Sequence, residues 1–418
     1  MNNLYQIPHG YKSSPIGPIP GDWEVKKLKE ILLEGRLGGN YENAEENNGI
    51  PVIKMGNLDR GNIKINKLQC LPVNEKYNNE DVLLEGDLLF NTRNTLDLVG
   101  KVAIWRNELP FAVYNSNLMR MKFNEKLIAS NLFMNYAFNS HYSLSQLRGI
   151  ATGTTSVAAI YGRDLEKVKF PLPPLPEQNA IAIILSRWDT AISKISALIT
   201  QKELRKKWLA QQLLNGKKRV SGFNGEWKLI HISEVSKEVS IKNRTDKDIP
   251  VLSCTKYNGL VPSLEYFGRK IFADDLTTYK VVPRNHFAYA TNHIEEGSIG
   301  YQENFDEALI SPMYTVFKTD SSINDYFFYK LLKSYRCIYE YQAWMKGSID
   351  RRGGLRWEAF SKIKVQVPSI EEQTAIAKAL QTADTEINLL KTTLDKLKEQ
   401  KKGLMQILLT GKKRLINQ

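Results

Sequence analysis

Cysteine is scarce in this chain of 418 residues. Only three occur, at Cys70, Cys254 and Cys337, and they stand far apart. An odd number at such wide spacing forms no disulfide framework and matches no set of zinc ligands. We therefore expect a protein of a reducing compartment, the cytoplasm, without a structural metal.

Long apolar runs are lacking as well. No run approaches the roughly eighteen residues that a membrane-spanning helix needs. The longest candidate, Ala180–Leu185, is stopped by Ser186-Arg187. The first residues also lack the basic and then apolar pattern of a signal peptide. The sequence thus gives no indication of a membrane partner.

Catalytic motifs are absent too. The chain has no Gly-x-x-x-x-Gly-Lys-Ser/Thr phosphate loop. Its one Pro-Pro pair, Pro173-Pro174, is flanked by leucines rather than by the Asn or Asp and the aromatic residue of an adenine methyltransferase. The five histidines show no metal-binding spacing. We expect a non-catalytic protein with no cofactor; the alternative is an enzyme with an unrecognised centre, which turnover by the isolated chain would reveal.

Acidic residues are outnumbered by basic ones. The 58 Lys and Arg against 45 Asp and Glu give a net charge of +13. This balance suggests a polyanionic partner, usually nucleic acid, although many plain cytosolic proteins reach a similar value. Residues 23–170 carry 19 basic and 17 acidic groups, and residues 220–366 carry 20 and 18. Most of the excess therefore lies outside these two stretches.

One segment of the chain is written twice. Pro176-Glu-Gln-Asn-Ala-Ile-Ala182 recurs as Glu371-Glu-Gln-Thr-Ala-Ile-Ala377, a shift of 195 positions. The same shift carries the later Gly216-Lys-Lys-Arg219 onto Gly411-Lys-Lys-Arg414. An ungapped repeat of this extent indicates a duplicated structural unit.

Both copies have the pattern of a long helix. Apolar residues recur at alternating steps of four and three, which is typical of a coiled-coil seam. A helix of about 36 residues would be about 54 Å long, and two such helices are most simply buried against each other. Ser369 and Glu372 predict a capping box, and Gly216 and Gly411 predict left-handed C-terminal caps. Three lysines interrupt the seam, either as snorkelling side chains or as a docking site for a partner: Lys202, Lys206 and Lys401.

The segments before the two helices repeat more loosely. Gly21-Asp-Trp23 resembles Gly225-Glu-Trp227, and short strand-like runs alternate with turn residues in both segments. A helix is expected near 129–138 in the first module and near 325–333 in the second. We predict an α+β protein with two similar mixed α/β modules, largely non-parallel sheets and an internal pseudo-two-fold repeat. The predicted domains are residues 1–170, 171–219 (first helix), 220–366 and 367–418 (second helix).

Three kinds of motif accompany the order of module, helix, module, helix. They are the opening Ser14-Pro-Ile-Gly-Pro-Ile-Pro-Gly-Asp-Trp23, the junction Pro171-Leu-Pro-Pro-Leu-Pro-Glu-Gln178 and the closing Gly-Lys-Lys-Arg stretches. Together they resemble the specificity subunits of type I restriction-modification systems, and the resemblance covers essentially the whole chain. The second junction departs from the family pattern, since Val367-Pro-Ser-Ile-Glu-Glu-Gln373 lacks the double proline.

The resemblance implies a DNA-binding role. Each module would be a target-recognition domain that reads one half of a split, asymmetric duplex sequence. The helices would pack as an antiparallel coiled-coil spacer. Two methyltransferase (modification) subunits would dock on them, and restriction subunits would join the complex. The alternative is a coiled-coil scaffold that does not read DNA, which salt-dependent binding to duplex DNA would distinguish.

Readers of DNA present polar and basic side chains on exposed loops, where these pair with base edges. Two clusters in each module fit this requirement, although each alone also fits an ordinary solvated turn. Their matching places in both modules favour DNA contact. The candidates are Asn91, Thr92, Arg93, Asn94, Lys101, Thr154, Thr155 and Ser156 in the first module, and Thr291, Asn292, His293, Lys346, Ser348, Arg351, Arg352 and Arg356 in the second.

Overall fold

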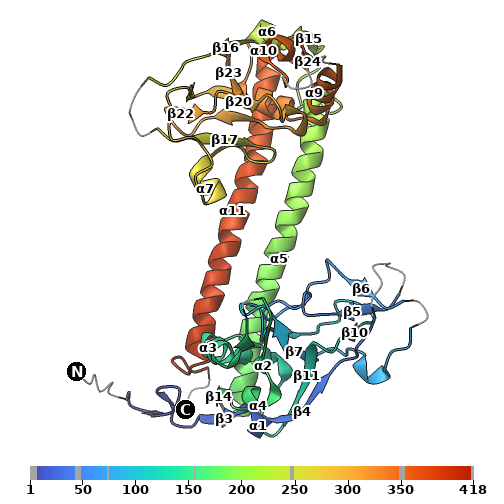
Figure 1. Cartoon of the computed structure of the whole chain (residues 1–418), viewed down its shortest axis with the longest axis vertical. Helices are drawn as coiled ribbons and strands as arrows, with labels where there is room; N and C mark the ends of the chain where they lie inside the picture. The colour runs from blue at the N-terminus through green and yellow to red at the C-terminus, as the bar shows by residue number, and fades with distance from the viewer. Residues whose placement is uncertain are drawn as a thin grey trace. The chain divides into compact units, whose positions relative to one another are not determined.

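The computed structural model describes residues 7–42, 49–72, 75–154, 156–244, 249–347 and 354–415. The chain divides into two compact units, one of Met1–Ser196 with Thr393–Gln418 and one of Ala197–Thr392. Each unit holds one module and half of each of the two long helices, α5 (Leu175–Leu214) and α11 (Ile370–Leu408), which are green and red in Figure 1.

The module of the first unit is built around a four-stranded antiparallel sheet in the order β4-β11-β7-β9. A second sheet, β10-β5-β6, contains a parallel pair, β5 with β10. Two further sheets are small, β12-β13-β8 and β14-β3. The elements are β1 (Tyr11–Lys12), β2 (Ile19–Pro20), β3 (Glu24–Lys27), α1 (Leu28–Ile31), β4 (Leu32–Leu37), β5 (Pro51–Ile53), β6 (Gln69–Cys70), η1 (Asn79–Asp81), β7 (Leu88–Asn91), β8 (Arg93–Asn94), β9 (Val102–Ile104), β10 (Val113–Tyr114), β11 (Leu118–Phe123), α2 (Asn131–Phe138), α3 (His141–Ile150), β12 (Thr152–Gly153), β13 (Ala158–Ala159), α4 (Gly162–Leu165) and β14 (Lys169–Leu172).

The module of the second unit repeats this plan. Its main sheet, β16-β23-β20-β21, has the same order as the first, and β15-β24 corresponds to β3-β14. The elements are β15 (Lys228–His231), α6 (Ile232–Val235), β16 (Ser236–Val239), β17 (Leu252–Thr255), β18 (Gly259–Pro262), α7 (Ser263–Phe267), β19 (Lys280–Pro283), β20 (His286–Ala290), η2 (Ile294–Glu296), β21 (Ile299–Gln302), β22 (Glu307–Ile310), β23 (Tyr314–Thr319), α8 (Asp325–Leu332), α9 (Tyr335–Gly347), α10 (Trp357–Phe360) and β24 (Lys364–Val367). The predicted α+β repeat with largely non-parallel sheets is confirmed.

The predicted helices form, with small differences at their ends. Ser130 and Asn324 cap α2 and α8, because their side chains accept hydrogen bonds from the backbone N–H groups of Phe133 and Phe327. The long helices have 40 and 39 residues rather than 36. None of the helices in the described ranges is long and apolar enough to cross a membrane.

The glycines that follow the long helices adopt the predicted left-handed conformation. Gly216 has φ +70° and Gly411 has φ +72°, which residues with a side chain rarely adopt. The predicted capping box at Ser369 forms only in part. Its hydroxyl accepts a weak bond from the N–H of Glu372 at 3.5 Å, but the Glu372 carboxylate binds Arg219 instead of returning to the helix start. A buried ion pair replaces the second half of the box.

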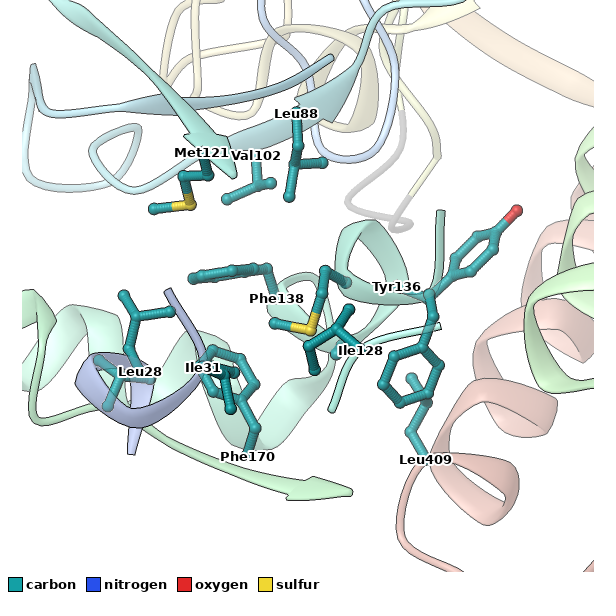
Figure 2. Packing of buried hydrophobic residues seen from close by; sticks show 14 of the residues in the cluster. Leu28, Ile31, Leu88, Val102, Met121, Ile128, Tyr136, Phe138, Phe170 and Leu409 are labelled. Carbon is teal, nitrogen blue, oxygen red and sulfur yellow. The ribbon is translucent and has the colours of Figure 1, made fainter. Parts of the chain in front are cut away.

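The core of each module includes the end of a long helix. In the first unit Leu409, which directly follows α11, joins the cluster shown in Figure 2, where Phe138 and Phe170 lie edge to face with ring centroids 4.7 Å apart. In the second unit Leu214 of α5, its counterpart in the repeat, packs into the equivalent core. Burial of one leucine contributes about 1.5–3 kcal/mol, so these contacts fix the helix ends on the modules.

Candidate nucleic-acid interface

A small sheet brings the two predicted clusters of the first module together. β13 pairs with β8 on one side, with Ala159 opposite Arg93, and with β12 on the other, with Ala159 opposite Thr152. The backbone N–H of Ile160 also donates to the carbonyl of Thr92 at 3.0 Å. The loop after β7 and the hairpin between β12 and β13 therefore form one continuous surface, although they lie far apart in the sequence.

The side chains of this surface divide into exposed and buried ones. Arg93, Thr154 and Ser156 are exposed, and no hydrogen bond or ion pair occupies the Arg93 guanidinium among the described residues. Thr154 and Ser156 share a hydrogen bond of 3.1 Å in the hairpin turn. Asn94 and Lys101 are half-buried at the margin. These groups can reach a ligand without rearrangement of the fold.

Asn91 and Thr92 have a different role from the one expected. Asn91 is fully buried, and its side-chain oxygen accepts the N–H of Arg93 at 3.2 Å. Thr92 donates its hydroxyl to the carbonyl of Asn117 at 2.9 Å. The prediction that Asn91 contacts DNA is corrected here: its burial lets it shape the loop that presents Arg93. Thr155 lies outside the described residues.

The second module repeats the same connection. Thr291 donates its hydroxyl to the carbonyl of Met313 at 3.0 Å, as Thr92 does to Asn117, and the N–H of Leu355 donates to the carbonyl of Thr291 at 2.9 Å. The shift of 195 positions carries Ile160 onto Leu355. The predicted loop after β20 and the predicted segment before α10 therefore meet as their counterparts do.

Glycine is required at this meeting point. Gly354 has φ +62°, and a Cβ there would lie 2.4 Å from the side-chain oxygen of Asn292 and 2.5 Å from the carbonyl of Thr291. Asn292 and Arg356 are exposed beside it, and Arg356 precedes α10. Ser348, Arg351, Arg352 and the side chain of Lys346 lie outside the described residues.

His293 is exposed next to two glutamates. Its Nδ1 lies 3.9 Å from a carboxylate oxygen of Glu296, and one ligand atom each of His293, Glu295 and Glu296 lies within 4.8 Å of the others. Exposed acidic groups commonly gather without an ion, and we assign none to this place. Its basic ring keeps His293 among the candidates for contact with DNA.

Two exposed side chains of the first surface were not predicted. Tyr161 precedes α4 and is 58% exposed, and Val157 in the hairpin turn is 67% exposed. The repeat shift carries Tyr161 onto Arg356, so an extension of the repeat beyond the helices would have identified it. An exposed aromatic ring at this place can pack against a base or a sugar, where the other module offers a guanidinium.

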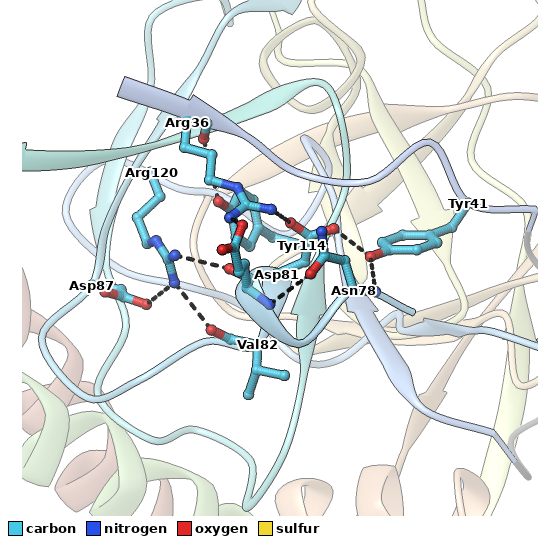
Figure 3. A network of polar contacts seen from close by, with 9 residues as sticks. Arg36, Tyr41, Asn78, Asp81, Val82, Asp87, Tyr114 and Arg120 are labelled. Atoms are coloured by element: carbon cyan, nitrogen blue, oxygen red, sulfur yellow. Dashed lines mark hydrogen bonds and ion pairs between the residues drawn. The ribbon is translucent and has the colours of Figure 1, made fainter. Parts of the chain in front are cut away.

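Two other arginines of the first module are already paired. Arg36 binds Asp81 at 3.1 Å and Arg120 binds Asp87 at 3.2 Å, in the network that Figure 3 shows. Tyr41 donates to Asp81, and burial followed by this hydrogen bond raises the pKa of Tyr41 to about 12. These arginines stabilise the outer part of the module, whereas Arg93 remains available for a ligand.

The three seam lysines form ion pairs between the long helices. Lys401 lies 2.5 Å from Asp189 in the first unit, and its counterpart Lys206 pairs with Asp384 in the second. Lys202 lies 2.5 Å from Glu386. The lysines therefore neither snorkel into solvent nor stand free for a partner, and they fix the antiparallel register within each unit.

Two tyrosines tie these ion pairs to the modules. Tyr136 of α2 donates to Asp189 at 2.6 Å, and Tyr326 of α8 donates to Asp384 at 2.5 Å. Burial alone would raise the pKa of Asp384, but hydrogen bonds from Lys206 and Tyr326 outweigh that effect and hold its pKa below the ordinary value. Each module is thereby attached to the helices at a defined point.

The repeated sequence motifs form a second attachment. Glu177, of which 1% is exposed, binds Arg414 at 2.8 Å and accepts from the indole N–H of Trp23 at 3.1 Å. Glu372 and Arg219 form the corresponding pair in the second unit. The buried amides of Gln178 and Gln373 bind the backbone just before α2 and α8. The Glu-Gln and Gly-Lys-Lys-Arg motifs therefore join the two helices to each other and to the modules.

Known proteins are similar to this chain in sequence and in fold. The type I restriction modification DNA specificity domain matches residues 20–203 and again residues 224–399. A putative type I restriction enzyme specificity subunit, MjaX, of Methanocaldococcus jannaschii is 27% identical over 97% of each chain. The MjaVIII specificity subunit of the same organism is 23% identical over 96% of this chain and 95% of its own.

A solved structure agrees in its fold. The type I restriction-modification system S subunit from M. genitalium has a TM-score of 0.56 at 17% identity, and the match covers 93% of this chain and 96% of that one. These findings confirm the predicted resemblance and a specificity role rather than a catalytic one. The two domain matches, which together extend over most of the sequence, show that this chain belongs to the family of type I restriction-modification DNA specificity subunits.

Proposed function

We propose that this chain reads a bipartite, asymmetric duplex DNA target and that each module recognises one half of it. The observation that carries the proposal is the meeting of two polar loops on one surface, held by the same backbone bond in both modules: Ile160 to Thr92 and Leu355 to Thr291. The surrounding side chains differ between the modules. Two similar frames with different contact residues suit two different half-sites.

The chemistry of the exposed groups supports this role. Arg93 in the first module and Arg356 in the second are exposed, with no side-chain partner in the described parts of the chain. A guanidinium can bind a guanine edge through two hydrogen bonds, and one such contact is worth about 1–3 kcal/mol of discrimination. Thr154, Ser156 and Asn292 add neutral hydrogen-bonding groups nearby.

The helices offer a surface for the modification and restriction subunits. Several apolar side chains on α5 and α11 are exposed rather than buried in the seam. We propose the exposed apolar side chains of the second unit as the docking region. Lys202 and Lys206 contribute to it indirectly, because their ion pairs keep the two helices in register there, as the ion pair of Lys401 does in the first unit. The exposed apolar side chains of the second unit are Leu198 (38%), Leu204 (63%), Trp208 (46%) and Leu389 (67%).

The proposal can be tested by mapping adenine methylation in the host genome. Loss of the gene should abolish methylation at one split, asymmetric motif. In the complemented strain, Arg93→Ala should weaken or relax recognition in one half of that motif and Arg356→Ala in the other. Lys126→Ala removes an exposed charge in the turn between β11 and α2, outside the β12-β13-β8 sheet, and should leave the pattern unchanged.

The possible results separate the alternatives. Equal damage to both halves by either arginine variant would contradict the assignment of one module to one half-site. A purified chain that binds no duplex DNA at any salt concentration would instead support the scaffold function.

A further inference from the structure

A hollow of about 880 Å³ in the first unit lies between α3 of the module and the end of α11. Six lysine and arginine side chains line it, and we call it the basic hollow: Arg60, Arg148, Lys398, Lys401, Lys402 and Lys412. It is distinct from the surface formed by β8, β12 and β13, yet it borders that surface. Arg148 lies near the end of α3, just before β12, and Arg60 reaches the carbonyl of Asp97, in the loop after β8, at 3.5 Å.

The basic hollow contains no free carboxylate among its described lining residues. Its one acidic lining residue, Asp189, already accepts hydrogen bonds from Lys401 and Tyr136. Asp59, the sequence neighbour of Arg60, pairs with Lys64. Arg148, Lys402 and Lys412 are exposed and have no ion pair in the described part of the chain. The hollow is therefore strongly positive.

Arg60 shows the need for an anion most directly. Its Nη1 is buried and makes no hydrogen bond to the rest of the described structure. Burial lowers the pKa of Arg60, and the like charge of Arg148 adds to that effect. An unpaired, partly buried cation is unfavourable unless a negatively charged group comes to it. A phosphate can bind two guanidinium groups at once through paired hydrogen bonds.

We propose that the basic hollow binds backbone phosphates of the duplex beside the half-site read by the first module. This inference rests on the proposed function and extends it to residues that contact the DNA backbone and do not distinguish one base from another. Contacts to phosphates fix the position of the duplex, while base contacts provide the sequence specificity. The hollow would thus hold the duplex in register with Arg93 and Tyr161.

The test is the salt dependence of duplex binding by the purified full-length chain. Two double variants remove one wall each: Arg60→Gln with Arg148→Gln, and Lys402→Gln with Lys412→Gln. The matched control is Lys29→Gln with Lys126→Gln, which removes the same charge from exposed positions outside the hollow. Binding is measured to two duplexes: one contains the motif that the methylation map of the host genome identifies, and the other lacks that motif.

Each lost phosphate contact lowers the slope of log affinity against log salt by about 0.9. We expect each hollow variant to lower the slope by about 1.8, so the fall in affinity between about 50 and 200 mM salt becomes roughly tenfold smaller. The loss should be equal for both duplexes, and the control should keep the wild-type slope. Arg148→Gln alone, at an exposed position, should lower the slope by about half as much and guards against misfolding of the double variant.

The outcomes separate this inference from the proposed function. If the unmodified chain binds no duplex, the proposed function fails. If it binds the motif but the hollow variants keep its salt slope, the inference about the hollow is overturned and the proposed function stands. A hollow variant that keeps this slope but no longer copurifies with the modification subunit would assign the hollow to an acidic protein segment, which also overturns the inference.

Discussion

Replacing Arg414 by methionine should destabilise the first unit through a carboxylate in another part of the chain. Arg414 makes three contacts of 2.8–3.1 Å to the two oxygens of Glu177. It also binds Asp22, which is 37% exposed and would be rehydrated when the arginine is lost. Glu177 is only 1% exposed and cannot be rehydrated without local opening. The loss of stability in the Arg414→Met variant therefore comes mainly from the buried, unpaired charge of Glu177.

The magnitude follows from the partners that remain. Removal of one member of a buried ion pair costs about 3–5 kcal/mol when the other charge is left unpaired. Glu177 would retain the indole N–H of Trp23 at 3.1 Å and the backbone N–H of Leu415 at 3.2 Å. We therefore expect the lower end of the range, about 3 kcal/mol, which for a unit of this size lowers the Tm by about 6–12 °C.

Calorimetry of the full chain can test this reasoning with three variants. Arg414→Met should lower the Tm of the first unit, and the added Glu177→Gln should restore most of the loss because the buried charge is gone while the acceptor for Trp23 remains. Lys413→Met, at the exposed neighbouring position, should have little effect. A double variant as unstable as Arg414→Met alone would refute the assignment of the cost to the buried charge of Glu177.

Three further predictions concern the second unit and the reading surfaces. The pKa of Asp384 is lowered in the folded chain, so the stability that this carboxylate contributes is complete above its ordinary pKa of about 3.9 and is lost as the pH falls below that value. Asp384→Asn removes this contribution, and the free energy of unfolding in urea should therefore depend less on pH in the acid range. Gly354→Ala should impair one half-site, whereas Gly268→Ala, at φ +64° with open space around it, should cost only backbone strain of about 1–2 kcal/mol; equal loss of binding in both would contradict the close contact at Gly354. Tyr161→Ala should weaken the half-site of the first module by about 1–3 kcal/mol in a duplex-binding assay and leave the other half unchanged.

Local features of the sequence determined much of this fold. The alternation of four and three between apolar residues is enough to specify a long helix with a buried stripe, because it depends only on the helical repeat. The left-handed caps at Gly216 and Gly411 follow from the freedom of glycine at positive φ. The ungapped repeat required two equivalent units, whatever their detailed packing. Each of these inferences needs only neighbouring residues or a comparison within the chain.

Tertiary structure alone decided which distant groups meet. The sequence left the seam lysines open to interpretation as solvated or as docking side chains, with the solvated one favoured, whereas the structure places Lys206 and Lys401 opposite Asp384 and Asp189. Glu372 fitted a capping box by its spacing, but a buried carboxylate gains more from Arg219 than from a backbone N–H at the helix start.

Burial and loop contacts were also beyond the sequence. Asn91 belongs to a polar run in the sequence that predicts an exposed loop, yet it is the last residue of β7, which is buried throughout. The joining of the loop after β7 with the β12–β13 hairpin depends on strand pairing between segments far apart in the chain, which no local pattern encodes. Sequence therefore determined the elements and their repetition, because these rest on short-range geometry. The packing of the whole chain determined the pairings, because they depend on which surfaces exclude water together.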